Sequence, residues 1–249
     1  MRRDALLVAF LWTALTLVGE VLAAVFDFFP LAAAEEAKVV DDAFRILVIL
    51  GIPVFTFVVA ALVYSALRFR RRREQLDDGA PIRSNRTVVA TWLLATTVLT
   101  MVVIIFPGVT GLRQLRERAH AQDQMVVQVE GAQWFWKMTY PERGAVSYGE
   151  LVLPLGRPVR FEVSSMDVIH AFWVPAFRMK VDALPGRTTT VHATPDKTGT
   201  FQDNSGFRLQ CAELCGVGHG IMGVPVRVVA PEEFLAWAAQ HTPAPPLIR

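Results

Sequence analysis

The chemistry of this chain is concentrated in one short run that holds its only two cysteines, separated by three residues. The run spans residues 210–222 and offers two thiolates, an imidazole and a thioether from Cys211, Cys215, His219 and Met222. Sulfur ligands combined with imidazole favour copper or zinc over harder metal ions. With one further histidine from elsewhere in the chain, these ligands are enough for two copper ions that share both thiolates.

A shared pair of thiolates suits electron transfer, because an electron spread over two metal ions changes each metal–ligand bond little. The residues alone leave two alternatives open. A disulfide between Cys211 and Cys215 would fit an oxidising compartment, but it leaves His219 and Met222 without a role. A tetrahedral zinc site of two Cys and two His overlaps this spacing, but the thioether of Met222 favours copper.

The pattern Cys-x-Glu-x-Cys-x-x-x-His-x-x-Met resembles the CuA motif of subunit II of cytochrome c oxidases. Two upstream segments resemble the same family. One is the aromatic stretch from Gly131 to Trp136, and the other runs from Asp167 through His170 to Arg187. The resemblance covers the chain from about residue 44 to the helix that ends near Gln240. It implies a cupredoxin-like domain whose metal ligands lie in loops at one end of a sandwich.

Residue by residue, the resemblance implies side-chain copper ligands at His170, Cys211, Cys215, His219 and Met222. Glu213 would bind copper through its backbone carbonyl, and its carboxylate matches the position that reaches a Mg or Mn ion shared with subunit I. Trp134 matches the tryptophan through which electrons arrive from cytochrome c, although a strand tryptophan also serves as a core or interface anchor. Asp167 matches an acidic position at which the electron donor docks.

A membrane anchor is predicted in the first half of the chain, where most of the 53% hydrophobic residues are concentrated. Three apolar stretches near residues 5–26, 44–67 and 87–110 each approach the length of about twenty residues that crosses hydrocarbon. Backbone groups in lipid must be paired within the segment, so these stretches are expected to be helices. We predict a transmembrane anchor over residues 1–118 and an all-β domain over residues 119–249.

The orientation of the anchor follows from charge, since Lys and Arg in short loops favour the cytoplasmic side. Arg2 and Arg3 precede the first stretch, and arginines crowd the loop between the second and third stretches, at Arg68, Arg70, Arg71, Arg72, Arg73, Arg83 and Arg86. The loop after the first stretch is acidic. We therefore expect a multi-pass protein of a bacterial-type inner membrane with a periplasmic carboxyl-terminal domain. The arginines then reflect topology and not nucleic-acid binding.

The first apolar stretch has a second interpretation. It follows Arg2-Arg3 and leads to Ala32-Ala33-Ala34, which together resemble a secretory signal with a cleavage site before Glu35. A signal core is typically about 7 to 15 residues, shorter than this stretch. We favour a retained helix, which departs from the two-helix anchor usual in the family.

The second half predicts a sandwich or barrel of antiparallel strands, because short β-branched and aromatic segments are separated by Gly and Pro. The predicted strands are 125–130, 134–140, 159–164, 188–193, 207–211 and 224–229. A closing helix starts at Pro231, with Phe234, Leu235 and Trp237 as its packing face. The remaining histidines of this half and its edge lack neighbouring ligands and are assigned surface or core roles: His120, His192 and His241.

The residues and the resemblance are compatible with three function classes. The favoured one is the electron-input subunit of a terminal oxidase, in which copper passes electrons from a c-type cytochrome to haem in subunit I, where oxygen is reduced to water with proton translocation. The second is a copper subunit of a nitric oxide reductase. The third is a membrane-anchored copper chaperone or thiol redox protein. No Cys-x-x-Cys-His occurs in the sequence, so covalently attached haem c is not expected.

Two departures from the family pattern limit the resemblance. The acidic residue that many members carry near the start of the last transmembrane helix has no counterpart in the stretch from Arg86 to Trp92. The soluble half also carries nearly balanced charges, so strong electrostatic steering of a basic donor is not expected.

Overall fold

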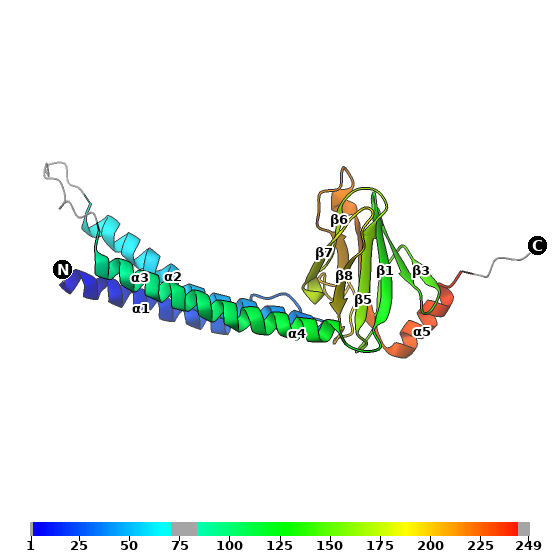
Figure 1. Ribbon diagram of the computed structural model, residues 1–249, viewed down its shortest axis with the longest axis horizontal. Coiled ribbons are helices and arrows are strands. Elements are labelled where there is room, and N and C mark those ends of the chain that lie inside the picture. The colour runs from blue at the N-terminus through cyan, green and yellow to red at the C-terminus, as the bar shows by residue number, and fades with distance from the viewer. Residues whose placement is uncertain (1, 71–83, 244–249) are drawn as a thin grey trace, which may run out of the picture. The chain divides into compact units, whose positions relative to one another are not determined.

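The structure is a computed structural model that describes residues 2–70 and 84–243 (Figure 1). The chain forms two compact units, Met1–Phe28 with Asp42–Leu112, and Phe29–Asp41 with Arg113–Arg249. Arg71, Arg72, Arg73 and Arg83, on which part of the predicted orientation depends, lie outside the described residues.

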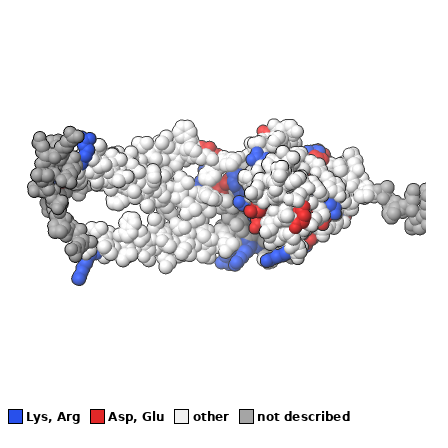
Figure 2. Space-filling model, turned by 90° about the horizontal axis from the view of Figure 1, so that it is seen from above, with Lys and Arg blue, Asp and Glu red and all other residues white. Residues whose placement is uncertain are grey.

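The first unit is helical. Helix α1 spans Arg2–Val25, α2 spans Glu35–Arg68 and α3 spans Arg86–Val103. The segment η1 (Ile104–Val109) follows α3, contains a kink at the non-helical Phe106 and leads into α4 (Thr110–Ala119). In the described part of the chain, three helical segments are long and apolar enough to cross a membrane, as the three apolar stretches predict. Figure 2 shows this part white along most of its length, with Lys and Arg toward its ends.

Helix α2 starts about nine residues before the predicted stretch near residue 44, because helix formation does not require the apolar residues that mark a membrane span. Its first turn contains Glu35 and Glu36, whose carboxylates are favourable at the positive end of the helix dipole. The helical run of α3 likewise extends past residue 110, because α4 continues to Ala119 with a polar, amphipathic sequence.

Helices α1 and α2 pack through specific side chains. The indole Nε1 of Trp12 donates to the carbonyl of Pro53 at 2.8 Å, and the hydroxyls of Thr16 and Thr56 lie 2.7 Å apart. The ring of Trp12 also meets Phe57 edge-on at a centroid distance of 5.5 Å. Hydrogen bonds of this kind hold helices together in lipid, where apolar contact alone gives little preference between neighbours.

The second unit is a sandwich of two five-stranded sheets. The first sheet has the order β3 (Ala145–Ser147), β2 (Phe135–Tyr140), β1 (Met125–Ala132), β5 (Val159–Ser165) and β8 (Thr189–Ala193). The second has the order β4 (Leu151–Pro154), β10 (Gly223–Val229), β9 (Arg208–Cys211), β6 (His170–Val174) and β7 (Met179–Ala183). Two short 3-10 helices, η2 (Pro175–Phe177) and η3 (His219–Ile221), and helix α5 (Pro231–Gln240) complete it.

The sheets are mixed and not purely antiparallel as predicted, because β1 pairs with β5 and β4 pairs with β10 in parallel. All six predicted strands form. Four further strands form that were not predicted, β3, β4, β6 and β7. β3 has three residues, and β4 and β6 are buried almost throughout, so none of these three shows a clear period-two pattern. β7 does alternate between apolar and polar residues, over five positions.

Helix α5 buries Phe234 and Trp237 as predicted, and with them Ala238. The prediction for Leu235 is wrong, since its side chain is 44% exposed. Residues three and four apart share a helix face, whereas Leu235 follows Phe234 directly and therefore points away from that face.

Residues 29–41 belong to the sandwich unit although they precede and begin α2. Ala33, Ala34 and Ala37 are completely buried in its core. The amide of Ala33 donates to the carbonyl of Ala176 at 2.8 Å, and its own carbonyl accepts from Asp196 at 3.1 Å. The alanine-rich sequence before Glu35 is therefore part of the sandwich core.

Polar contacts fix the same segment. Arg178 donates to both carboxylate oxygens of Asp41, at 2.7 and 3.1 Å, and to the carbonyl of Leu31 at 3.2 Å. The carboxylate of Glu36 accepts from the amide and the hydroxyl of Thr194 at 2.7 and 3.2 Å. Asp41 and Glu36 are both buried. We refer to residues 29–41 with Arg178 and Thr194 as the clasp.

Candidate metal centre

The strand pairing brings the predicted metal ligands to one end of the second sheet. His170 is the first residue of β6 and Cys211 is the last of β9, and these antiparallel neighbours pair Phe172 with Cys211. The loop after Cys211 returns to begin β10 at Gly223, opposite Gln210. In Figure 1 this orange loop lies at the upper end of the strands, away from α5.

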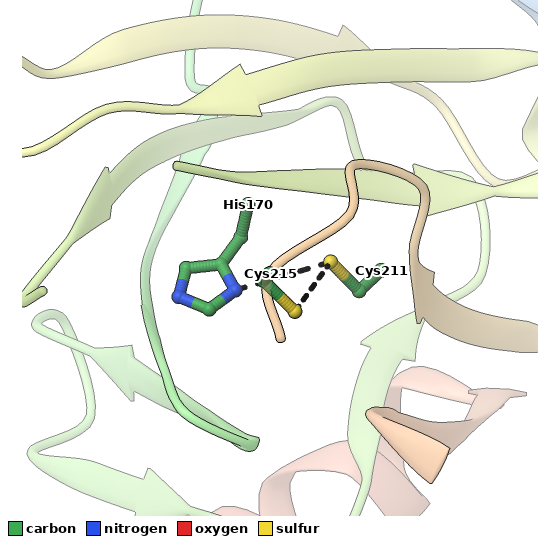
Figure 3. A group of neighbouring side chains, drawn as sticks. All are labelled: His170, Cys211 and Cys215. Carbon is green, nitrogen blue, oxygen red and sulfur yellow. Dashed lines mark hydrogen bonds between the residues drawn. The ribbon is translucent and has the colours of Figure 1, made fainter. Parts of the chain in front are cut away.

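Three buried side chains form the centre of the site (Figure 3). His170 Nδ1, Cys211 Sγ and Cys215 Sγ all lie within 4.8 Å of one another. His170 Nδ1 is 3.9 Å from Cys211 Sγ, and the two sulfurs are 3.7 Å apart. Met222 is also buried, with its thioether sulfur 3.8 Å from Cys215 Sγ.

Two further predicted ligands adjoin this centre from the loop. His219 Nδ1 lies 3.7 Å from Cys215 Sγ, and the backbone carbonyl of Glu213 lies 3.1 Å from Cys211 Sγ. The Glu213 residue as a whole is exposed to solvent, although its backbone carbonyl lies against Cys211. The structure therefore brings all six residues proposed from the sequence to one place.

Asp167 orients the first histidine. Its carboxylate receives the Nε2 hydrogen of His170 at 2.8 Å and the amide hydrogens of Gln133 and Val168 at 2.8 and 2.6 Å. Partial burial raises the pKa of Asp167, but these hydrogen bonds outweigh it and lower the pKa to about 2. An ionised carboxylate can only accept, so Nε2 of His170 carries the proton and Nδ1 presents its lone pair to Cys211.

Trp134 lies against the cysteine loop. It was predicted to begin the strand 134–140, but it sits in the turn between β1 and β2, one residue before β2 starts, and is 39% exposed. Its indole Nε1 donates to the carbonyl of Cys215 at 3.2 Å. A Cβ on Gly218 would lie 2.3 Å from the indole Cδ2, so only glycine admits the ring at this position. The Trp134 side chain therefore extends from the protein surface to the backbone of Cys215, a candidate metal ligand.

The donor set suits a soft metal ion. Two thiols, two imidazoles and a thioether are the ligand types that select copper, and most of them are shielded from water. Burial, followed by the hydrogen bond with Cys211, raises the pKa of the Cys215 thiol to about 11. The sulfurs, which are weak hydrogen-bond donors and acceptors, lie against one another and against imidazole nitrogens, and sulfur and imidazole are both ligands that copper favours.

The other histidines lie apart from this cluster. His192 is in β8 opposite Arg160, and His241 follows α5 with its ring stacked on Trp237 at 4.5 Å. His120 is exposed beyond α4. Gln133 lies within the aromatic stretch but was assigned no role from the sequence; its side chain donates to the carbonyl of Cys215.

Comparison with known proteins agrees with these observations. The family model for the cytochrome c oxidase subunit II periplasmic domain matches residues 147–229. Cytochrome c oxidase subunit 2 of Synechocystis sp. is 32% identical over 87% of this chain and 76% of its own length. The same subunit of Thermostichus vulcanus is 33% identical over 85% of this chain and 78% of its own length.

Among solved structures, the periplasmic domain of subunit II of cytochrome oxidase (CoxB) of Bradyrhizobium japonicum is 33% identical, with a TM-score of 0.45. The match covers 49% of this chain and 95% of that domain. The full-length relatives carry the assignment, because their similarity extends over both the helices and the sandwich. The chain belongs to the subunit II family of cytochrome c oxidases.

Proposed function

We propose that this chain is the electron-input subunit of a terminal oxidase and that its six clustered residues hold a binuclear copper centre, CuA. The observation that carries the proposal is the convergence of His170, Cys211 and Cys215, buried and within 4.8 Å of one another, with Met222 beside them. Cys211, Cys215, His170 and Met222 would hold the copper ions, and His219 and the Glu213 carbonyl would complete the ligand set.

Copper held by these donors would supply one-electron transfer. The chain's own contribution is a rigid set of ligands: the strands β6 and β9 fix His170 and Cys211, and Asp167 fixes the imidazole. Rigidly held ligands limit the change in metal–ligand geometry when the copper centre gains or loses an electron. Trp134 would receive the electron, because its half-exposed indole is one hydrogen bond from the Cys215 carbonyl.

The partners follow from family membership. A c-type cytochrome would dock on the face that holds Trp134 and Asp167. Because Asp167 already accepts four hydrogen bonds within the chain, its contribution to docking would come from its charge. Electrons would pass to haem in subunit I, where oxygen is reduced to water and protons are translocated. The exposed carboxylate of Glu213 would reach a Mg or Mn ion shared with subunit I.

The helices support a membrane location. Three segments long and apolar enough to span a bilayer would anchor residues 1–118 as a multi-pass protein of a bacterial-type inner membrane. Residues 119–249 would face the periplasm, where a soluble cytochrome can reach the copper site. The clasp indicates that residues 29–41 also belong on the periplasmic side of this boundary.

The first experiment is metal analysis of the full chain purified in mild detergent with copper. We expect two coppers per chain and a mixed-valence spectrum in which the unpaired electron is split over both nuclei. One copper with a four-line hyperfine pattern would contradict the binuclear site. Cysteines that cycle between dithiol and disulfide without holding copper would favour the chaperone class.

The second experiment identifies the complex. Gentle purification should bring down a large partner with two haems and a third copper, and that complex should reduce oxygen. Trp134→Ala should slow electron transfer from cytochrome c far more than it slows oxygen reduction driven by electrons supplied beyond the copper centre. A complex that reduces nitric oxide and not oxygen would favour the second function class.

A further inference from the structure

We propose that Gln133 is a positioning residue that ties the histidine-bearing strand β6 to the cysteine-bearing loop and so holds the ligand set together before metal binds. The inference rests on the proposed copper site. It assigns to one amide side chain a role in metal affinity, although this side chain offers no ligand to the metal.

One arm of the tie runs through the backbone. The amide nitrogen of Gln133 donates to Oδ2 of Asp167 at 2.8 Å, and Oδ1 of the same carboxylate accepts from His170 Nε2 at 2.8 Å. The carboxylate therefore has one oxygen on Gln133 and the other on the metal-binding histidine. A displacement of Gln133 would be transmitted directly to the orientation of the imidazole.

The other arm runs through the side chain. Nε2 of Gln133 donates to the carbonyl of Cys215 at 2.8 Å, a shorter contact than the 3.2 Å from Trp134 to the same oxygen. The next residue, Gly216, has φ of +115° and turns the loop so closely that a Cβ there would lie 3.1 Å from Gln133 Nε2. The loop conformation and the glutamine amide therefore fit each other.

The loop needs such a tie because its side chains bury little surface. Leu214 is 79% exposed and Val217 is 99% exposed, so the side chains on either side of the buried Cys215 do not hold the loop backbone by hydrophobic packing. The ends of the loop are fixed by the amide of Cys211 on Met222 and the amide of Ala212 on Ala171. Gln133 supplies a fixed point in its middle, at Cys215.

Glutamine suits this position by its length and its donor group. Groups that orient metal ligands typically change metal affinity about tenfold to a hundredfold when they are removed. Gln133→Met keeps a similar length and volume and removes the donor. The matched control is Gln128→Met in β1, the strand that precedes the turn holding Gln133, since Gln128 is exposed and its side-chain amide donates to Glu162 at 3.4 Å.

The test uses the full chain in detergent. Copper affinity is measured by competition with a chelator, and the accessibility of Cys211 and Cys215 in metal-free protein is measured by the rate of alkylation. We expect Gln133→Met to bind copper about tenfold more weakly and to be alkylated faster, while Gln128→Met matches the wild-type. Wild-type affinity and alkylation rate in Gln133→Met would overturn the inference.

A double-mutant cycle separates the tie from a general structural effect. Asp167→Asn weakens the histidine arm, and if Gln133 links both arms, its effect on copper affinity and on the hyperfine splitting will be non-additive with Gln133→Met. Additive effects would overturn the link. If Gln133→Met unfolds, Gln133→Asn replaces it, since its shorter amide cannot span the same gap. Failure of the wild-type chain to bind copper would instead overturn the proposed function.

Discussion

The two ends of the sandwich unit both contain buried polar groups, but they are satisfied in different ways. In the clasp, Arg178 and Glu36 meet carboxylate, carbonyl, amide and hydroxyl partners at ordinary hydrogen-bond distances within the chain. At the metal centre, the cysteine and methionine sulfurs face one another and two imidazoles at 3.7 to 3.9 Å. Sulfur is a weak hydrogen-bond donor and acceptor, so these contacts, together with the 3.1 Å contact of Cys211 Sγ with the Glu213 carbonyl, stabilise the buried sulfurs less than the clasp stabilises its charged groups.

This difference in hydrogen bonding distinguishes the clasp, a structural network, from the metal centre, a candidate binding site. Strong donors and acceptors that close on one another stabilise the fold and leave nothing for a ligand. A cluster of soft donors without strong partners gains little from burial unless a metal ion binds to it. The outer groups of the metal centre, Asp167 and Gln133, resemble the clasp, since both make short hydrogen bonds within the chain.

The largest expected effect is on the metal centre itself. Cys215→Ser should abolish the binuclear spectrum, because this sulfur adjoins Cys211, His219 and Met222 together. Metal analysis and electron paramagnetic resonance measure the loss. The thermal unfolding of the metal-free protein should change little, as the clasp is untouched. Two coppers per chain in this variant would show that the sulfur is not shared.

At the clasp we expect the opposite result, a large loss of stability with little effect on copper binding. Arg178→Ala leaves the buried carboxylate of Asp41 without its ion pair, and removing one partner of a buried pair typically costs about 3–5 kcal/mol of unfolding free energy. Thermal or denaturant unfolding of the full chain measures this loss. Any protein that remains folded should still bind copper. Arg157→Ala is the control, because its pair with Glu142 is more exposed and should contribute less than about 1 kcal/mol.

The contrast also explains which features could be predicted from the sequence. The ligand loop was predicted because its chemistry is local, with five of the six candidate residues lying between 211 and 222. The clasp was missed because Ala33 and Ala34 have the composition of a cleavage site, and their burial depends on Ala176 and Asp196, far along the chain. The bonds of Asp167 and Gln133 depend on how three separate segments meet.

A smaller effect is expected at the edge of the ligand set. Met222→Leu removes the thioether that lies 3.8 Å from Cys215 but keeps the apolar volume. A weak thioether ligand tunes the reduction potential more than it holds the metal. We expect copper to be retained at two per chain with a shifted potential, which is measured by redox titration. Loss of copper in this variant would place Met222 among the principal ligands.

The smallest effect concerns His192, which lies on β8 beside the clasp and tests whether that region is a closed network. Burial lowers the pKa of His192, and the nearby charges of Arg160 and His120 also lower it, while Glu36 opposes them. Since the folded pKa lies below the unfolded value of about 6.5, the unfolded chain binds more protons as the pH falls through that range. The unfolding free energy should therefore decrease below about pH 6.5.

His192→Gln should remove this part of the pH dependence, so the difference in unfolding midpoint between about pH 8 and about pH 5 should shrink relative to the wild-type. His120→Gln, at an exposed position, should reduce it much less. Copper affinity at neutral pH should not change in either variant, because neither imidazole belongs to the metal centre. An unchanged pH dependence in His192→Gln would mean that β8 beside the clasp admits a charged imidazole, and that this region is more open than its hydrogen bonds indicate.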